Sequence, residues 1–371
     1  MTSQSAGVLL PAHGGQLGAI AAQFSTPVNE LLDFSASIYP GGPPPGVSNA
    51  LAGAICSPEC IRAYPDLESL ELRENLANYV HVPVGNIVVA NGMVPLFSAT
   101  LRAIDARKCL LPVPAFGEYR RTLHREGVAV ETYLLTEGTG FRPDPEKLLA
   151  YCTRRGCDTL IFTNPHNPTG ALLQRAELQA LVQSAETCGV RVLLDEAFID
   201  FVPNESLAEQ VVQSNNLFVF RSVTKFFAMA GLRVAYMVAP QRFASAITGR
   251  LDPWPISTLA SIATIAAVNE ATYIVTTIAC VQSERKSLRG ELSDLGLMVF
   301  PSWANFLFFR LGNAQHDRNL WERLILEYGI VVRNCATFEG LDETFFRVAV
   351  RGAKDNQRLV QALYALLNEI A

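Results

Sequence analysis

Short apolar runs alternate with helix-like stretches through the middle of the chain, and this alternation restricts the fold more than any other feature. Apolar runs that are separated by helices are typical of a mainly parallel sheet with both faces covered. Helix-like stretches such as 145–155 and 176–189 lie between several of the runs. The predicted strands are 86–90, 108–113, 128–135, 158–163, 190–196, 216–221 and 233–239.

The two ends of the chain differ from this alternating region. The N-terminal part contains no Lys or Arg and closes with the Pro- and Gly-rich run PGGPPPG at 40–46. The C-terminal part mixes long helical stretches with short strand-like ones, which is typical of a smaller α+β unit. We therefore predict an N-terminal arm (1–45), a large domain (46–255) and a small C-terminal domain (256–371).

The composition argues against two classes of protein. Hydrophobic residues make up 49% of the chain and charged residues 18%, which supplies enough apolar material for a buried core and argues against a disordered protein. The net charge of −5 argues against a general nucleic-acid binder, which needs a basic face. The first Lys or Arg is Arg62, so we expect no secretory or mitochondrial targeting segment and no appended basic DNA-binding segment of a regulator.

The sequence also indicates where the protein acts. Its most apolar stretch, 256–281, is interrupted by Asn269 and Glu270, so we interpret it as a packed helix and expect no membrane partner. The eight cysteines are scattered, and two close pairs lack the second pair or histidine cluster of a metal site. Ordinary thiols are typical of a reducing compartment, so we expect no metal and a cytoplasmic location.

The stretch SVTKFFAMAGLR (222–233) places Lys225 among aromatic and small residues. An exposed helix lysine is the alternative, but it would not need such apolar neighbours. Burial and nearby cations lower the pKa of a lysine and make it a nucleophile toward a carbonyl. We interpret Lys225 as the residue that forms an imine with an aldehyde cofactor, whose phosphate binds Ser222, Thr224 and Arg233.

Two turns that follow predicted strands supply weaker signals. Gly92 opens a helix in NGMVP, where free backbone N–H groups favour a phosphate, with Met93 and Val94 in the first turn. An ordinary strand-to-helix turn is the alternative. Phe116 follows the next strand and would stack on a flat ring, although a core aromatic residue would give the same pattern.

Two further motifs place polar groups at strand ends. TNPHNPTG (163–170) forces a turn that leaves the amide of Asn167 free to donate. Asp195 ends an apolar strand, so its carboxylate is expected at the carboxyl edge of the sheet, where α/β proteins bind ligands. If this carboxylate is buried, it needs a cation as partner. The alternative interpretation is that Asp195 is the N-cap of a helix.

Together these groups describe a pyridoxal phosphate site. The order and spacing of NPHNPTG, DEAF and SVTKFFAMAGLR resemble the aminotransferase class I and II family of fold-type I pyridoxal-phosphate enzymes, along almost the whole chain. The resemblance implies an α/β fold with a large, mainly parallel sheet between helices and a smaller α+β C-terminal domain. It also implies pyridoxal 5'-phosphate as cofactor, Lys225 and Asp195 as catalytic residues, and a homodimer with shared active sites.

Shorter pieces, including LDFSASIYP at 32–40 and the tail 332–351, are similar to the threonine-phosphate decarboxylase subgroup of this family. Histidinol-phosphate aminotransferases are close relatives of that subgroup. The resemblance implies that Tyr64 reaches the cofactor phosphate of the neighbouring subunit. It also implies a phosphorylated amino-acid substrate that contacts His13, Gly14, Ser37, Asn167, Arg333 and Arg347.

The chain departs from the pattern of its relatives at three places. Ser37 stands where the subgroup usually has Asn as a substrate contact. Met93 and Val94 replace a polar pair, which leaves only backbone donors for the phosphate. Phe198 stands where many aminotransferases have a Tyr that bonds the cofactor phenolate, although the decarboxylase subgroup shares the Phe.

The resemblance implies decarboxylation of L-threonine O-3-phosphate to (R)-1-aminopropan-2-yl phosphate in cobalamin biosynthesis. Two alternatives stay open: transamination of a phosphorylated amino acid or amine of the histidinol-phosphate type, and decarboxylation of another phospho- or phosphono-amino acid. The bond at Cα that stands perpendicular to the cofactor ring is the one that breaks, so orientation decides between these reactions. His13, Arg333 and Arg347 are the expected clamps, because a guanidinium holds a carboxylate or phosphate at two points.

Overall fold

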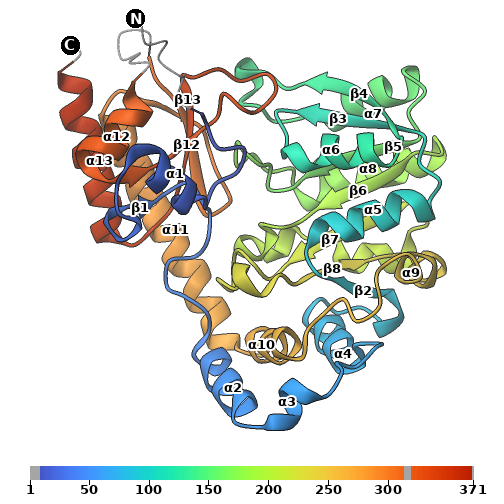
Figure 1. Ribbon diagram of the computed structural model, residues 1–371. Helices are drawn as coiled ribbons and strands as arrows, with labels where there is room; N and C mark the ends of the chain where they lie inside the picture. Colours follow the sequence, from blue (N-terminus) through green and yellow to red (C-terminus); the bar gives the residue numbers. More distant parts are fainter. Residues whose placement is uncertain (1–8, 313–318, 370–371) are drawn as a thin grey trace, which may run out of the picture.

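The computed structural model describes residues 9–312 and 319–369, so the first eight residues of the predicted arm lie outside it. A seven-stranded sheet with the order β2-β8-β7-β6-β5-β3-β4 forms the larger part of the molecule (Figure 1). Only β8 runs antiparallel to its neighbours. The strands are β2 (Ile87–Ala90), β3 (Lys108–Val113), β4 (Ala129–Leu134), β5 (Thr159–Thr163), β6 (Arg191–Asp195), β7 (Leu217–Ser222) and β8 (Ala235–Val238).

Each predicted strand is present and begins within two residues of its expected start. The strands are apolar throughout because helices cover both faces of the sheet. Alternate residues show this: Leu193 packs with the helices on one face, whereas Leu194 packs with those on the other. The first face carries α5 (Met93–Ala103), α6 (Gly117–Arg125) and α9 (Gln241–Thr248); the second carries α4 (Leu70–Tyr79), α7 (Pro145–Arg154), α8 (Arg175–Thr187) and α10 (Thr258–Val268).

A second, smaller body contains a four-stranded antiparallel sheet with the order β12-β13-β10-β9. Helices from both ends of the chain share its hydrophobic core, and α1 lies beside α12 and α13 in Figure 1. The division into domains at residues 45 and 255 stays a prediction. The elements are α1 (Leu17–Phe24), β9 (Met298–Val299), β10 (Phe306–Arg310), α12 (Leu320–Tyr328), β12 (Arg333–Asn334), β13 (Phe345–Ala349) and α13 (Ala353–Asn368).

The prediction of one packed helix across 256–281 is wrong. The chain forms α10 and then α11 (Ala271–Asp294), bent by 74° at Asn269 and Glu270. Glu270 is held at the bend because its Oε1 accepts a hydrogen bond from the backbone N–H of Gly46 at 3.0 Å. Gly46 belongs to α2 (Pro45–Ile55), which is followed by the short α3 (Pro58–Arg62).

The bend separates two packing environments. Helix α10 packs against α2 and α4 beside the large sheet, whereas α11 runs from there to the smaller body (Figure 1). In the described ranges 9–312 and 319–369, no single helix has the length and apolarity to cross a membrane. The bent pair α10 and α11 meets those two criteria only when both helices are taken together.

A two-stranded parallel pairing fastens the N-terminal segment to the smaller body. β1 (Leu32–Asp33) pairs with β11 (Ile330–Val331), and the backbone N–H of Leu32 donates to the carbonyl of Gly329 at 2.7 Å. Gly329 adopts φ 63° at the end of α12, and a Cβ there would lie 2.6 Å from the carbonyl oxygen of Glu30. Only glycine therefore fits this approach without strain.

We expect Gly329→Ala to destabilise the protein more than Gly140→Ala does, as measured by urea unfolding. Both glycines have a positive φ, so each substitution costs about 1 kcal/mol in backbone conformation. A Cβ at Gly140 would meet no atom within 4 Å, so this position lacks the added clash at Gly329. Equal losses at the two positions would contradict the proposed close packing of β1 against β11.

Candidate active site

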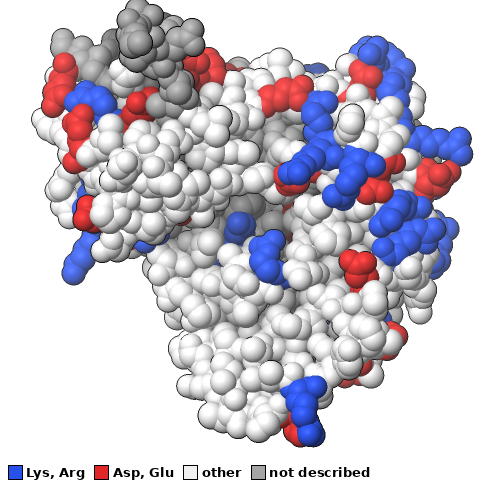
Figure 2. All heavy atoms as spheres, viewed as in Figure 1, with Lys and Arg blue, Asp and Glu red and all other residues white. Residues whose placement is uncertain are grey.

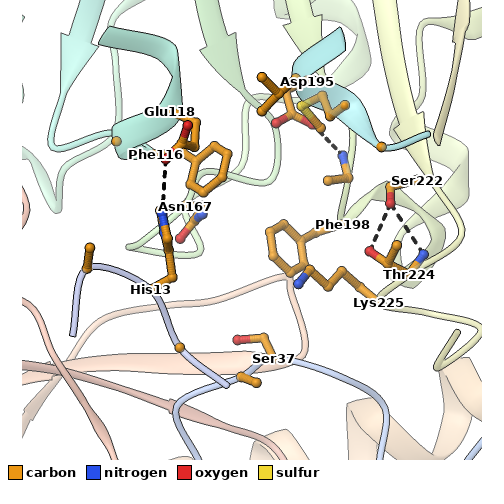
Figure 3. Close-up of a pocket in the computed structure, with 18 of the residues that line it drawn as sticks. His13, Ser37, Phe116, Glu118, Asn167, Asp195, Phe198, Ser222, Thr224 and Lys225 are labelled. Carbon is orange, nitrogen blue, oxygen red and sulfur yellow. Dashed lines mark hydrogen bonds and ion pairs between the residues drawn. The ribbon is translucent and has the colours of Figure 1, made fainter. Parts of the chain in front are cut away.

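The carboxyl ends of β5, β6 and β7 face the smaller sheet across a cavity of about 490 Å³. Every predicted site residue except Tyr64 lines this cavity. Figure 2 shows Lys and Arg side chains inside the hollow between the two bodies, and Figure 3 shows how the main residues surround it. The chain thus brings together segments from its N-terminus, its central sheet and its C-terminal third.

One end of the cavity has the form of an anion cradle. Gly92 precedes α5 with φ 89°, and a Cβ there would lie 3.2 Å from a terminal guanidinium nitrogen of Arg233. The free N–H groups at the start of α5 favour an anion at this position. Ser222 and Thr224 face the same space, with their hydroxyl oxygens 2.8 Å apart (Figure 3). Met93 and Val94 also line the cavity and contribute no polar side chain.

Lys225 follows β7 by three residues, and the exposed part of its side chain faces the cavity. Burial lowers the pKa of Lys225 to about 8, and the positive charges of Arg347 and Arg233 add to this effect. Asp195 opposes it by stabilising the charged amine. A substantial share of Lys225 is therefore neutral near pH 8, which is the form that attacks a carbonyl.

Asp195 is the last residue of β6, and its carboxylate is buried. Its Oδ1 accepts a hydrogen bond from the N–H of Ala197 at 2.8 Å, and its Oδ2 accepts a short one from the hydroxyl of Tyr119. Burial raises the pKa of Asp195 to about 6, although both hydrogen bonds and Lys225 oppose the rise. The carboxylate is thus costly to keep ionised, and a cationic ligand group would stabilise it.

The remaining predicted contacts on the large body are Phe116 and Asn167. Phe116 precedes α6 and lines the cavity, with its ring 5.7 Å from that of His13. The amide oxygen of Asn167 accepts a hydrogen bond from Arg347 at 2.5 Å. No acceptor for its amide nitrogen is found within the described residues, so that nitrogen is available to a ligand.

Arg333 and Arg347 are direct neighbours across the pair β12 and β13, although they are fourteen positions apart in sequence. Both are buried, and burial lowers the pKa of each, that of Arg347 to about 10. Their partners are neutral oxygens, including the carbonyls of Ala12 and Ser35. Within ranges 9–312 and 319–369, neither forms an ion pair with a carboxylate, and the Nε of Arg347 is buried without a partner.

The N-terminal segment completes the cavity above the two arginines. His13 lies opposite Glu118 on α6, with its Nε2 3.0 Å from the carboxylate (Figure 3). A Cβ at Gly14 would lie 2.1 Å from the carbonyl oxygen of Ser35, so only glycine allows this close approach. Ser37 lines the cavity, and its hydroxyl oxygen is buried without a hydrogen-bond partner.

Tyr64 and Phe198 differ from the polar cavity residues described above. Tyr64 lies away from the cavity of its own chain, is 81% exposed and stacks on Trp254 at a ring distance of 4.9 Å. A reach to a neighbouring subunit stays a prediction. Phe198 lines the cavity and packs edge-on against Phe306, so at this position the site has an apolar ring and no hydroxyl.

Three polar contributors were missed by the sequence analysis. Tyr119 bonds Asp195, Glu118 bonds His13, and Thr337 accepts a hydrogen bond from Arg333 at 2.6 Å. Glu118 and Tyr119 lie two and three residues after Phe116, so the signal for Phe116 was the one sequence feature that pointed to this segment. Thr337 gave none, because its role depends on the turn that follows β12.

The cavity fits pyridoxal phosphate on its own geometry. It offers a cradle of backbone N–H groups, hydroxyls and Arg233 at one end and a buried carboxylate at a strand end. A lysine with a lowered pKa and an aromatic ring at the edge complete the set. The described residues contain no group of three or more His, Cys, Asp or Glu that is arranged to hold a metal.

Comparison with known proteins agrees with this geometry. The model of the family "Aminotransferase class I and II" matches residues 29–363. The chain belongs to this family. This is the family that the motifs resemble, so the match confirms the predicted fold class and the predicted dependence on pyridoxal phosphate.

The chain is similar in sequence and structure to proteins of two activities. A threonine-phosphate decarboxylase from Salmonella typhimurium is 34% identical over 97% of this chain and 98% of its own length. The crystal structure of the histidinol-phosphate aminotransferase from Clostridium acetobutylicum is 31% identical, with a TM-score of 0.84 over 91% of this chain and 100% of that one. The structure of L-threonine-O-3-phosphate decarboxylase from Porphyromonas gingivalis is 26% identical, with a TM-score of 0.78 over 90% and 99%.

We expect Ser37→Ala to raise the free energy of unfolding of the ligand-free protein by about 1 kcal/mol, because a buried hydroxyl without a partner is unfavourable. Ser35→Ala is the matched control. Its hydroxyl donates to Asp33 at 2.6 Å and accepts from the N–H of Gly15 at 2.9 Å, so its removal should lower stability. Urea unfolding of both variants tests this, and a loss of stability in Ser37→Ala would show that its hydroxyl is already satisfied.

Proposed function

We propose that the protein decarboxylates L-threonine O-3-phosphate with pyridoxal phosphate, forming (R)-1-aminopropan-2-yl phosphate for cobalamin assembly. One observation carries the proposal: two buried guanidinium groups lie side by side at the cavity without a carboxylate partner among the described residues. Such a pair suits a substrate with two anionic groups, here a carboxylate and a phosphate. Similarity to the Salmonella typhimurium enzyme over nearly the full chain supports the same substrate class.

The residues of the cavity have distinct roles in this proposal. When bound, pyridoxal phosphate supplies the electron sink for the bond that breaks at Cα. Its phosphate would be held by Gly92, Ser222, Thr224 and Arg233, and the carboxylate of Asp195 would stabilise positive charge on its ring. Phe116 would support one face of that ring, and the amide nitrogen of Asn167 would donate a hydrogen bond to a polar atom of the cofactor.

Arg333, Arg347, His13 and the hydroxyl of Ser37 orient the substrate. By fixing both anionic groups, they would decide which bond at Cα is aligned for cleavage. Loss of CO2 leaves an electron pair at Cα, and a proton must replace the carboxyl group there. We assign this proton transfer to Lys225, because it lies in the same cavity and its pKa of about 8 allows it to gain and lose a proton near neutral pH.

Transamination of a histidinol-phosphate type of substrate is the second candidate. The similarity to the Clostridium acetobutylicum structure favours it, since identity and TM-score exceed those of the decarboxylase structure. Histidinol phosphate carries a phosphate but no carboxylate, so it would use only part of the paired arginine site. Decarboxylation of another phospho- or phosphono-amino acid is a third candidate, because Ser37 alters the substrate side of the cavity.

We expect the purified protein with pyridoxal phosphate to release CO2 from L-threonine O-3-phosphate without any 2-oxoglutarate. Lys225→Ala should abolish this turnover and the visible absorbance of the bound cofactor, while circular dichroism stays unchanged. Lys147→Ala is the matched control, because Lys147 is exposed on α7 and should change neither signal. Amino transfer that depends on 2-oxoglutarate, with no CO2 released, would instead establish the aminotransferase.

The proposal includes a homodimer in the cytoplasm. Large apolar side chains around Tyr64, such as Ile61 and Trp254, are unusually exposed, which is typical of an interaction surface. In a dimer, Tyr64 would reach the cofactor phosphate of the neighbouring subunit. All eight cysteines lie within the described residues and are free, which suits a reducing compartment.

We expect sedimentation equilibrium to give a mass near twice that of the 40.5 kDa chain. Burial of the apolar surface around Tyr64 between two copies provides the physical reason. Ile61→Asp should shift the protein toward the monomer, because Ile61 is 72% exposed in one chain and its substitution places a charge on that surface. A monomer at micromolar concentration in the unsubstituted protein would rule out the shared site.

A further inference from the structure

Tyr119 is a buried residue of α6 whose hydroxyl lies at the edge of the large sheet. The hydroxyl contacts Asp195 by the short hydrogen bond described above and lies 3.0 Å from the hydroxyl of Thr163. Thr163 and Asp195 are paired residues at the carboxyl ends of the adjacent strands β5 and β6. One phenol group therefore spans the ends of two of the three strands that border the cavity.

The ring of Tyr119 has a second contact with the site. It meets the ring of Phe116 edge-on, with centroids 5.5 Å apart and planes at 86°. It also packs against Phe97 of α5 at 5.6 Å. The same side chain thus supports the aromatic ring and the carboxylate that are assigned to two different parts of the cofactor ring.

The chemistry of the pair fixes the direction of the hydrogen bond. Burial and the charge of Asp195 hold the pKa of Tyr119 well above its usual value, so the phenol keeps its proton and donates. Each oxygen of Asp195 then has one protein donor, the phenol on Oδ2 and the amide of Ala197 on Oδ1. Among the charged groups nearby, Glu196 disfavours the ionised carboxylate, whereas Lys225 favours it.

We propose that Tyr119 is a positioning residue for the cofactor ring: its hydroxyl keeps Asp195 ionised and directed at the cavity, while its ring supports Phe116. This inference rests on the proposed function, since it assigns Asp195 to the ring of pyridoxal phosphate. A purely structural role is the alternative, in which Tyr119 fills space between α6 and the sheet. The two roles differ in whether loss of the hydroxyl changes cofactor binding through Asp195.

Tyr119→Phe removes one donor to Asp195 and keeps the ring contacts. The carboxylate should then take up a proton at a higher pH, because a hydrogen bond that lowers its pKa is lost. Affinity for pyridoxal phosphate should fall roughly tenfold near pH 6, since the lost bond is to a charged group. The fall should be smaller at pH 8.5, where the carboxylate is ionised in both proteins.

The experiment measures the dissociation constant of pyridoxal phosphate from pH 5.5 to 9 by quenching of intrinsic fluorescence, on protein stripped of cofactor and reloaded. Tyr119→Phe should move the acid limb of the profile to higher pH. Thr163→Val is a second variant that leaves Tyr119 in place and loosens its hydroxyl, so it should shift the limb less in the same direction. In an Asp195→Asn background, Tyr119→Phe should have no further effect.

Tyr79→Phe is the matched control. Tyr79 donates to the buried carboxylate of Asp200 at 2.9 Å in the core on the opposite face of the sheet, and neither residue lines the cavity. This variant should lose stability without changing cofactor affinity or its pH profile. An unchanged profile in Tyr119→Phe, or an equal loss of affinity in the Asp195→Asn background, would overturn the inference alone. Failure of the unsubstituted protein to bind pyridoxal phosphate would instead overturn the proposed function, and the inference with it.

Discussion

The structure depends on charged groups that are removed from water around the cavity between the two sheets without neutralising one another. Lys225, Arg333 and Arg347 have lowered pKa values because burial disfavours their charge, and Asp195 has a raised one for the same reason. Such an arrangement is unfavourable by itself, and the hydrophobic cores on both faces of the sheet must offset it. A ligand with a cationic ring and several anionic groups would compensate these charges together.

A second buried charge cluster, only a few residues away, shows the contrast. Arg221 forms ion pairs with both Glu196 and Asp200, and Tyr79 completes the set with a hydrogen bond to Asp200. The charged groups are buried and paired, so their charges compensate one another behind the strand ends without a ligand. Asp195 and Glu196 are thus adjacent in sequence but differ in their surroundings. Glu196 is paired with Arg221, whereas Asp195 belongs to the cavity and has no ion-pair partner among the described residues.

Much of the fold and most of the cavity were predictable from the sequence because burial leaves a clear pattern. Strands covered on both faces need continuous apolar runs, so all seven strands of the large sheet were found. Lys225, Asp195 and Asn167 follow such runs closely, which places them at one edge of the sheet. The family motifs added the residues of the N-terminal segment and of the small sheet.

What the sequence did not reveal depends on tertiary contacts. The bend at Glu270 is fixed by a hydrogen bond to Gly46, which lies far away in the chain. Tyr119 has the same pattern as a core aromatic residue, so only the observed hydrogen bond to Asp195 separates the two interpretations. The side-by-side position of Arg333 and Arg347 follows from the register of β12 and β13, which their spacing alone does not define.

Arg333 also donates a hydrogen bond to the carbonyl of Pro11, 322 residues away, so one wall of the cavity joins opposite ends of the polypeptide. During synthesis the sheet can assemble early, but a finished pocket has to wait until the last strands have left the ribosome. The part of the cavity assigned to the substrate is therefore completed last, whereas the residues of the large body that are assigned to the cofactor lie between Gly92 and Arg233.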